Sequence, residues 1–121
     1  MIMIRNIAIA GILVAGLIFT AFAAAPDAVD ADPDHYAVEF ENDRVRILRI
    51  KYGPGEKSVM HSHKDSVAVI LTEGNFNMTL ADGSVINDQQ GAGSASWADA
   101  GDHLPENLSD QPAEVVLIEL K

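Results

Sequence analysis

The chain has 121 residues, a formal net charge of −10 at pH 7 and no cysteine. This length leaves room for one domain. The acidic balance argues against a nucleic-acid groove and against binding to an anionic membrane surface through basic residues. Without cysteine the chain cannot use disulfides, thiolate metal sites, iron–sulfur clusters or thiol catalysis. Any metal must therefore be bound by histidine, carboxylates or neutral oxygens.

The start of the chain predicts a cleavable export signal over residues 1–23. Arg5 supplies a positive charge, a long apolar run follows, and Ala-Phe-Ala at 21–23 is the small-x-small pattern that a signal peptidase needs. Cleavage after Ala23 would give a periplasmic or secreted protein with no stable membrane association. The alternative is a retained anchor, because the apolar stretch is just long enough to span a bilayer.

The next segment, residues 24–34, predicts an acidic flexible linker. From Pro26 onward it carries four aspartates, two prolines and no large apolar residue except Val29. Such a composition buries little apolar surface, and we expect the segment to be solvated and disordered. Ordered sequence is expected to begin near His35, at the edge of the linker, and we expect that side chain to be exposed to solvent.

Residues 35–121 alternate short β-type runs with turn signals, which predicts an all-β domain of seven or eight strands. The expected strands cover 36–40, 44–52, 58–63, 67–71, 76–80, a run starting at 85, 92–97 and 115–120. Turns are expected at 53–56 and at 81–83. No run of ten or more residues after the export segment has helical periodicity. The pattern indicates a small sandwich or barrel.

Two of the four histidines in this part, His61 and His63, are two residues apart. On an extended segment, side chains at that spacing point to the same face, so both imidazoles could reach one metal ion. The alternative is a pair of exposed or hydrogen-bonded histidines with no ligand role.

Glycines and a later histidine extend this pattern, and with them the sequence resembles the cupin superfamily over residues 36–121. The first cupin motif matches Gly55, His61, His63 and Gly74, and the second matches Gly101, His103 and Asn107. Two positions depart from the motifs. Val67 stands where a glutamate ligand is usual, and Asp99 stands where the turn before Gly101 usually has proline.

The resemblance implies a small jelly-roll β-barrel that holds a divalent metal ion on His61, His63 and His103. Three imidazoles suit Zn, Fe, Ni, Cu or Mn. The missing glutamate favours an anionic or chelating molecule that completes the coordination. The implied function is metal-dependent action on a small organic molecule, of dioxygenase or isomerase type. The alternative is a non-catalytic or structural cupin, and the resemblance also implies pairing into a homodimer.

For three other polar residues the sequence suggests the following roles. Asp65 could replace the missing carboxylate ligand or be a solvated turn residue. Glu106 could support the metal ligands from outside the coordination shell. Asn107 is expected to hydrogen-bond the backbone of a turn.

Among the remaining residues, Arg44 and Arg46 share a strand face and could hold a carboxylate substrate. Pairing with the acidic residues of 39–43 is the simpler account. Phe76 is expected in the core, and Trp97 is expected to pack in the core or at the rim of the barrel.

Overall fold

The computed structural model describes residues 15–16 and 23–121. The predicted export signal therefore lies almost entirely outside the described residues, and it stays a prediction. In the part of the chain that is described, no helix is long and apolar enough to cross a membrane.

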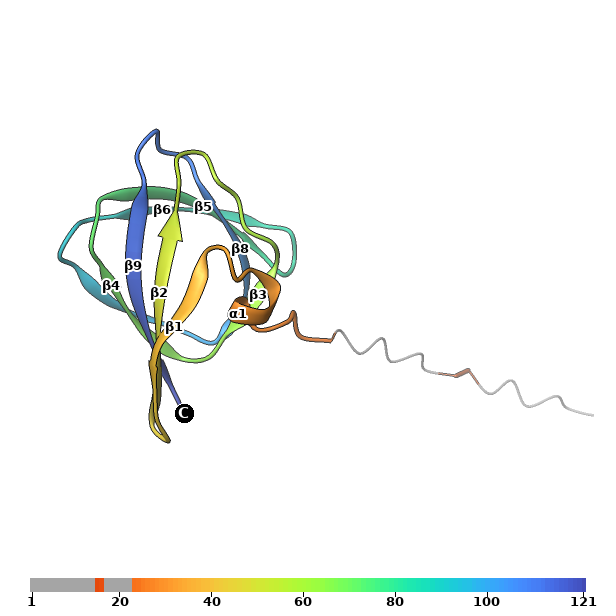
Figure 1. The fold of residues 1–121 in the computed structure, drawn as a ribbon. Helices are drawn as coiled ribbons and strands as arrows, with labels where there is room; N and C mark the ends of the chain where they lie inside the picture. Colours follow the sequence, from red (N-terminus) through yellow and green to blue (C-terminus); the bar gives the residue numbers. More distant parts are fainter. Residues whose placement is uncertain (1–14, 17–22) are drawn as a thin grey trace, which may run out of the picture.

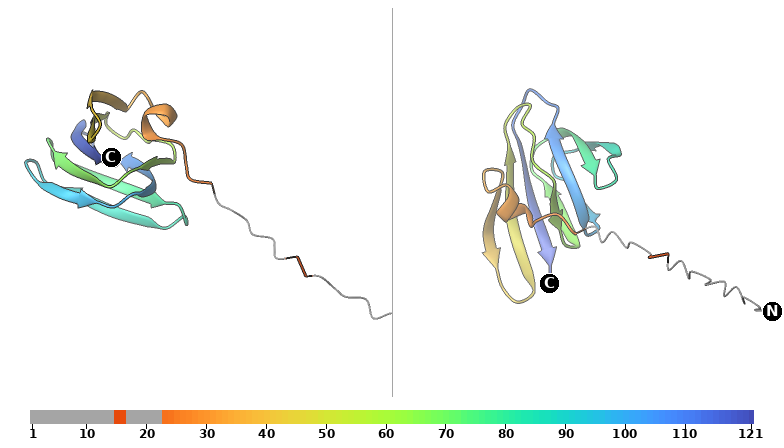
Figure 2. Two further views of the ribbon diagram at one scale, coloured as in Figure 1. Left: turned by 90° about the horizontal axis from the view of Figure 1, so that it is seen from below. Right: turned by 90° about the vertical axis from the view of Figure 1, so that its right-hand side faces the viewer.

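The domain consists of two antiparallel sheets that face each other (Figures 1 and 2). The five-stranded sheet has the order β1 (Tyr36–Glu41), β2 (Val45–Tyr52), β9 (Ala113–Leu120), β4 (Ser66–Ile70) and β7 (Ala95–Ala98). The four-stranded sheet has the order β3 (His61–His63), β8 (Gly101–Asn107), β5 (Gly74–Leu80) and β6 (Val85–Gln90). The predicted all-β jelly roll is confirmed.

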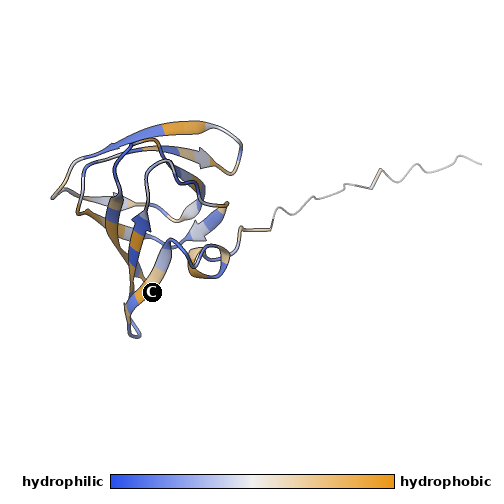
Figure 3. Ribbon diagram, turned by 45° about the horizontal axis from the view of Figure 1, so that its top comes forward, coloured by the Kyte–Doolittle hydropathy of each residue, from blue (hydrophilic) through white to orange (hydrophobic). Residues whose placement is uncertain are grey.

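The predicted turns are present, and a strand overlaps each predicted one, but two are shorter than predicted: β3 covers only the end of 58–63, and β7 begins at Ala95 because residues 92–93 form a turn. Gly83 closes the hairpin between β5 and β6 with a φ of +85°, a backbone conformation that side-chain-bearing residues rarely adopt. The Asp82 carboxylate accepts hydrogen bonds from the backbone N–H and the hydroxyl of Ser84, which fixes the turn. β6 is an edge strand that begins hydrophobic and ends hydrophilic (Figure 3).

One strand, β8, was not predicted as a strand from the sequence. Its residues GDHLPEN lack an alternating apolar face, and Pro105 in the middle cannot donate a ladder hydrogen bond. β8 nevertheless pairs with β5 along most of its length and with β3 at its start. What this strand turns to the interior is a histidine, a proline and an asparagine rather than aliphatic side chains.

Between the sheets lies a core of aromatic and aliphatic side chains. Phe76 is 3% exposed, as predicted. The buried apolar residues are Ala28, Tyr36, Leu48, Ile50, Tyr52, Phe76, Ala113 and Leu117, which form one cluster. Along β2 the inward side chains alternate with Arg49 and Lys51, which face outward and meet Glu114.

Residues 26–34 are ordered against the barrel, so the predicted disordered linker is wrong for this segment. Ala28–Ala31 form one helical turn, α1, beside β3 (Figure 1). Ala28 is completely buried in the core, and Asp27 caps the turn by accepting from the Val29 N–H. A segment poor in apolar residues is held here by one alanine and by ion pairing with the barrel.

The prediction that His35 is exposed to solvent is also wrong. Its side chain is 11% exposed, and its ring stacks on Tyr52 with centroids 4.4 Å apart. Its Nδ1 lies 2.7 Å from Asp32 Oδ2 and its Nε2 lies 3.0 Å from Glu56 Oε2. Two carboxylates and an aromatic ring therefore stabilise a histidine that was predicted to be exposed because of the polar composition around it.

The arginine pairing differs from expectation as well. Arg46 pairs with Asp27 and Glu119 rather than with the acidic residues of 39–43, because its side chain lies on the inward face of β2. Arg49, on the outward face, is the arginine that pairs with Glu39.

Leu48 should be the most sensitive core position, because it is fully buried at the centre of β2, between β1 and β9. We expect Leu48→Ala to lower the free energy of unfolding by about 2–5 kcal/mol, measured by equilibrium urea denaturation. Val85→Ala, at a position 57% exposed, is the control and should change it by about 0.5 kcal/mol or less. Equal effects of the two substitutions would contradict this description of the core.

Candidate metal centre

Three histidines from two paired strands meet at one end of the interior. His61 on β3 lies directly opposite His103 on β8, and His63 lies two residues further along the same face of β3. Each offers a ring nitrogen, and these three nitrogens all lie within 4.8 Å of one another. The structure thus brings together the three residues that the sequence selected.

The planes of the three imidazole rings are nearly perpendicular to one another. Their centroids are 4.8, 4.9 and 5.1 Å apart, and the angles between ring planes are 87°, 89° and 81°. Rings in this arrangement can direct three nitrogens at one point and leave the opposite side of that point open. This arrangement is compatible with a metal site on three histidines that leaves coordination positions free.

His61 provides the direct test of whether a metal ion fits. Its Nδ1 lies 2.8 Å from the carbonyl oxygen of Val59 and donates to it. Its Nε2 is buried and has no hydrogen-bond partner. A buried acceptor without a partner costs about 1–3 kcal/mol, which a cation at the centre of the three rings would offset. The nitrogen that is free is the one that faces the cluster.

Burial also keeps these ligands in the form that binds metal. It lowers the pKa of His61 to about 4 and that of His103 to about 3, and the neighbouring His63 adds to both shifts. A metal competes with protons for imidazole nitrogen, so neutral rings at mildly acidic pH favour coordination.

The sequence analysis missed a buried carboxylate, Glu119, which lies behind His63. It is 1% exposed, and its Oε2 lies 3.2 Å from His63 Nδ1 while its Oε1 accepts from Arg46 Nε at 2.6 Å. Burial raises the pKa of this carboxyl, but the hydrogen bonds from His63 and Arg46 outweigh it and hold the pKa below its usual value. An ionised acid in this place orients His63 with Nε2 toward the cluster.

A sequence signal for Glu119 existed. It shares the inward parity of β9 with Leu117, so it is an acidic residue on a strand face that otherwise enters the core. Such a residue needs a buried partner, and the opposite residue on β2 is Arg46.

Other predicted residues lie away from the cluster. Asp65 accepts from the Ala100 N–H, which confirms its reading as a turn residue. Glu106 lies on the opposite face of β8 from His103 and Asn107, so it faces away from the histidines, and the possible supporting role is wrong. Asn107 donates to the carbonyls of residues 53 and 111, as predicted.

Val67, at the position expected to hold a glutamate, also faces away from the interior. Its neighbours on β4, Ser66 and Ala68, are the residues that line the cavity between the sheets. None of the three residues at 66–68 is acidic, so β4 supplies no carboxylate to the histidine cluster at the position where the motif has glutamate.

A cavity of about 850 Å³ adjoins the histidines between the two sheets. His63 and His103 form part of its wall, and Tyr36, Phe76 and Met78 contribute apolar surface. This volume is in the range of sites for small organic molecules. The described lining contains four aspartates, Asp82, Asp88, Asp99 and Asp102, and neither lysine nor arginine.

Trp97 lies beside the cavity on the edge strand β7. It is 54% exposed, and its Nε1 donates to Asp99 at 2.8 Å. The prediction of core packing is therefore wrong, and a position at the rim is confirmed.

Comparison with solved structures supports the resemblance drawn from the motifs. A cupin domain from Bordetella pertussis shares 26% identity at a TM-score of 0.67, covering 83% of this chain and 99% of that chain. An RmlC-like cupin with a double-stranded β-helix fold from Methanocaldococcus jannaschii shares 22% identity at a TM-score of 0.54, covering 74% and 83%. A double-stranded β-helix protein from Klebsiella pneumoniae shares 18% at 0.57, covering 70% and 74%.

Family models and curated proteins give no match to the chain. The fold is nevertheless that of the cupin superfamily, a double-stranded β-helix of two facing antiparallel sheets. Within this fold the chain carries three histidines placed to bind one metal ion.

The neutral state of His103 predicts a pH-dependent stability of the metal-free protein. An unfolded histidine gains its proton near pH 6.5, whereas folded His103 stays neutral down to about pH 3. Lowering the pH therefore favours unfolding. Between about pH 5.5 and 4.5 we expect the unfolding free energy to fall by about 1.4 kcal/mol per pH unit more in the wild type than in His103→Asn.

Urea denaturation at several pH values measures this slope, and His35→Asn is the control with the opposite sign. Burial lowers the pKa of His35, but the hydrogen bonds to Asp32 and Glu56 outweigh it and raise the pKa. Its stabilising contribution is complete below pH 6.5 and is lost as the pH rises through the folded pKa. If the unfolding free energy of His103→Asn changed with pH as steeply as that of the wild type, this would contradict a His103 that stays neutral in the folded protein.

Proposed function

We propose that this chain is an exported single-domain cupin that binds one divalent metal ion through His61, His63 and His103. The observation that carries the proposal is the buried Nε2 of His61, which has no protein partner and belongs to a cluster of three converging imidazoles. The cavity beside the cluster would hold a small organic molecule. The metal would lie where that cavity meets the two histidine strands.

The donor set favours a borderline transition metal, and Zn, Fe, Ni, Cu and Mn are the candidates. Three neutral rings leave the ion its full charge of about +2 and open positions for other donors. A bound ion of this kind supplies Lewis acidity to a donor atom of a molecule in the cavity. Glu119 holds the His63 ring, and His61 is held by the Val59 carbonyl.

The charge of the side chains that line the cavity indicates which kind of molecule it would bind. Its described lining offers aspartates but neither lysine nor arginine, so a carboxylate would bind there chiefly through the metal. This composition favours an uncharged molecule with an apolar body and one donor atom. The acidic lining therefore argues against the anionic molecule that the missing glutamate led us to expect.

Two functions share this metal site and differ in turnover. In the first, the metal acts on the bound molecule as an enzyme of dioxygenase or isomerase type. In the second, the protein binds metal or ligand without reaction. Oxygen consumption or product formation by the metal-loaded protein, set against its metal-free form, separates the two. Export to the periplasm or medium and pairing into a homodimer are parts of the proposal that rest on the sequence alone.

Metal binding is the test of the proposal. We expect the purified protein to bind Zn²⁺ or Co²⁺ at one site, and His61→Asn or His103→Asn to weaken binding by more than about 100-fold. Isothermal titration calorimetry at pH 7 measures the affinity. The control is Val85→Ala, a substitution at a position 57% exposed on β6, away from the histidine strands. Equal affinity of all three variants and the wild type would contradict the site.

A further inference from the structure

The segment before β1 lies against the outer edge of β3, the strand that carries two of the histidines. The Ser62 N–H donates to the Pro26 carbonyl at 2.8 Å, and Asp27 forms a parallel bridge with Ser62. The Ala25 N–H donates to Asp102, next to His103, at 3.0 Å. The residue between His61 and His63 is thus held from outside the sheet by the chain that precedes the barrel.

From this segment a chain of charged contacts reaches His63. The Asp27 carboxylate accepts two hydrogen bonds from Arg46, at 3.1 and 2.5 Å. Arg46 also donates from Nε to Glu119 Oε1, and Glu119 Oε2 faces His63 Nδ1. Arg46 is 18% exposed and Glu119 is 1% exposed, so the contact between them is shielded from water, whereas Asp27 at the outer end is 35% exposed. Shielded charge-assisted contacts of this kind are strong and directional.

A second chain of contacts from the same segment reaches His61. The Ser58 hydroxyl donates to Asp32 Oδ2 at 2.5 Å, and its oxygen lies 3.3 Å from His61 Nδ1. Because the Ser58 hydroxyl donates its hydrogen to Asp32, its oxygen can only accept from His61. The His61 Nδ1–H therefore has two acceptors, the Ser58 oxygen and the Val59 carbonyl oxygen. His35 Nδ1 lies 2.7 Å from the same Asp32 oxygen, Oδ2.

Tyr36, which begins β1, adds a packing contact to both rings. Its ring centroid lies 4.6 Å from that of His61 and 5.5 Å from that of His63. Its hydroxyl is fixed by the Tyr52 hydroxyl at 2.6 Å, so the ring has little freedom to move. The polar contacts and the packing contact all come from residues 25–36.

We propose that residues 25–36, here named the N-terminal brace, set the orientation of His61 and His63 for metal binding. Asp27 and Asp32 are its positioning residues, acting through Arg46–Glu119 and through Ser58. Outer partners of this kind fix which ring nitrogen faces the metal and how the ring is turned. The inference rests on the proposed metal site and assigns to it the segment that precedes the barrel together with the first residue of β1.

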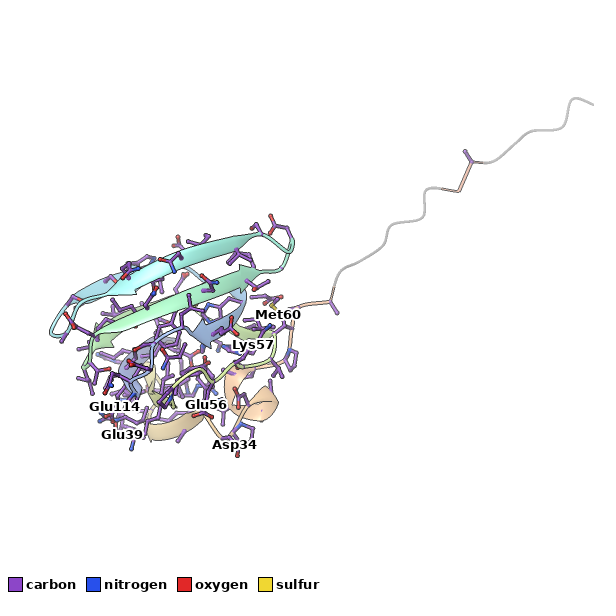
Figure 4. All side chains as sticks on the ribbon, turned by 90° about the horizontal axis from the view of Figure 1, so that it is seen from above. Asp34, Glu39, Glu56, Lys57, Met60 and Glu114 are labelled. Atoms are coloured by element: carbon purple, nitrogen blue, oxygen red, sulfur yellow. The ribbon has the colours of Figure 1, made fainter. Side chains whose placement is uncertain are left out.

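The test compares Asp27→Asn and Glu119→Gln with two controls. Asp30→Asn changes an exposed acid of α1, and Glu114→Gln changes a β9 acid that pairs with Arg49. Figure 4 shows Glu114 and Glu39, the two partners of Arg49, on a side of the barrel away from α1. We expect Co²⁺ affinity to fall about 10–100-fold in the first two variants and to stay within about threefold in the controls.

The visible spectrum of bound Co²⁺ separates positioning from stability. We expect the ligand-field bands to shift in Asp27→Asn and Glu119→Gln and to return in Asp27→Glu, which keeps a carboxylate for Arg46. Ser58→Ala tests the second chain without changing a charge and should also weaken Co²⁺ binding. Thermal unfolding of each metal-free variant shows whether it is folded at the temperature of the titration.

The outcomes have distinct meanings. Weaker binding and shifted bands in folded variants support the brace. Wild-type affinity and spectrum in folded Asp27→Asn, Glu119→Gln and Ser58→Ala would overturn it while leaving the metal site intact. If the wild type itself binds no Co²⁺, the proposed function fails, and the brace fails with it.

Discussion

Placing three histidines side by side at one end of the interior is the constraint on which the rest of the structure depends. Each ring has two nitrogens, and a buried nitrogen needs a partner. His61 gives one nitrogen to the Val59 carbonyl and leaves the other without a protein partner. Two strands must therefore be placed so that the remaining nitrogens converge, and β3 and β8 achieve this by pairing His61 opposite His103.

The same constraint explains why charged residues enter the interior beside His63. Glu119 would be costly to bury alone, but Arg46 donates to it from the opposite strand, and Asp27 in turn satisfies Arg46. These charges alternate in sign along one line from α1 to the histidine. The acidic segment before the barrel is consequently part of the domain, although its composition is that of a linker.

Much of the fold could be predicted from the sequence, and the site only in part. Alternating strands and glycine turns are local signals, so β5, β6 and the turn at Gly83 follow from them. The His61–His63 spacing and the motif around His103 indicated the ligands. The order of residues 26–34 and the role of Glu119 depend on contacts between distant positions, with Arg46 as the common partner, and no local pattern shows them. β8 was missed because its inward residues are a histidine, a proline and an asparagine, which give no alternating apolar pattern.

X-ray absorption at the zinc K-edge tests the central claim most directly. In protein loaded with one Zn²⁺, the account predicts three imidazole nitrogens at about 2.0–2.1 Å, with the remaining positions taken by light atoms of solvent or ligand. The imidazole signal should drop to two rings in His103→Asn. A wild-type spectrum with one imidazole or none, or a spectrum unchanged by that substitution, would contradict a centre built on His61, His63 and His103.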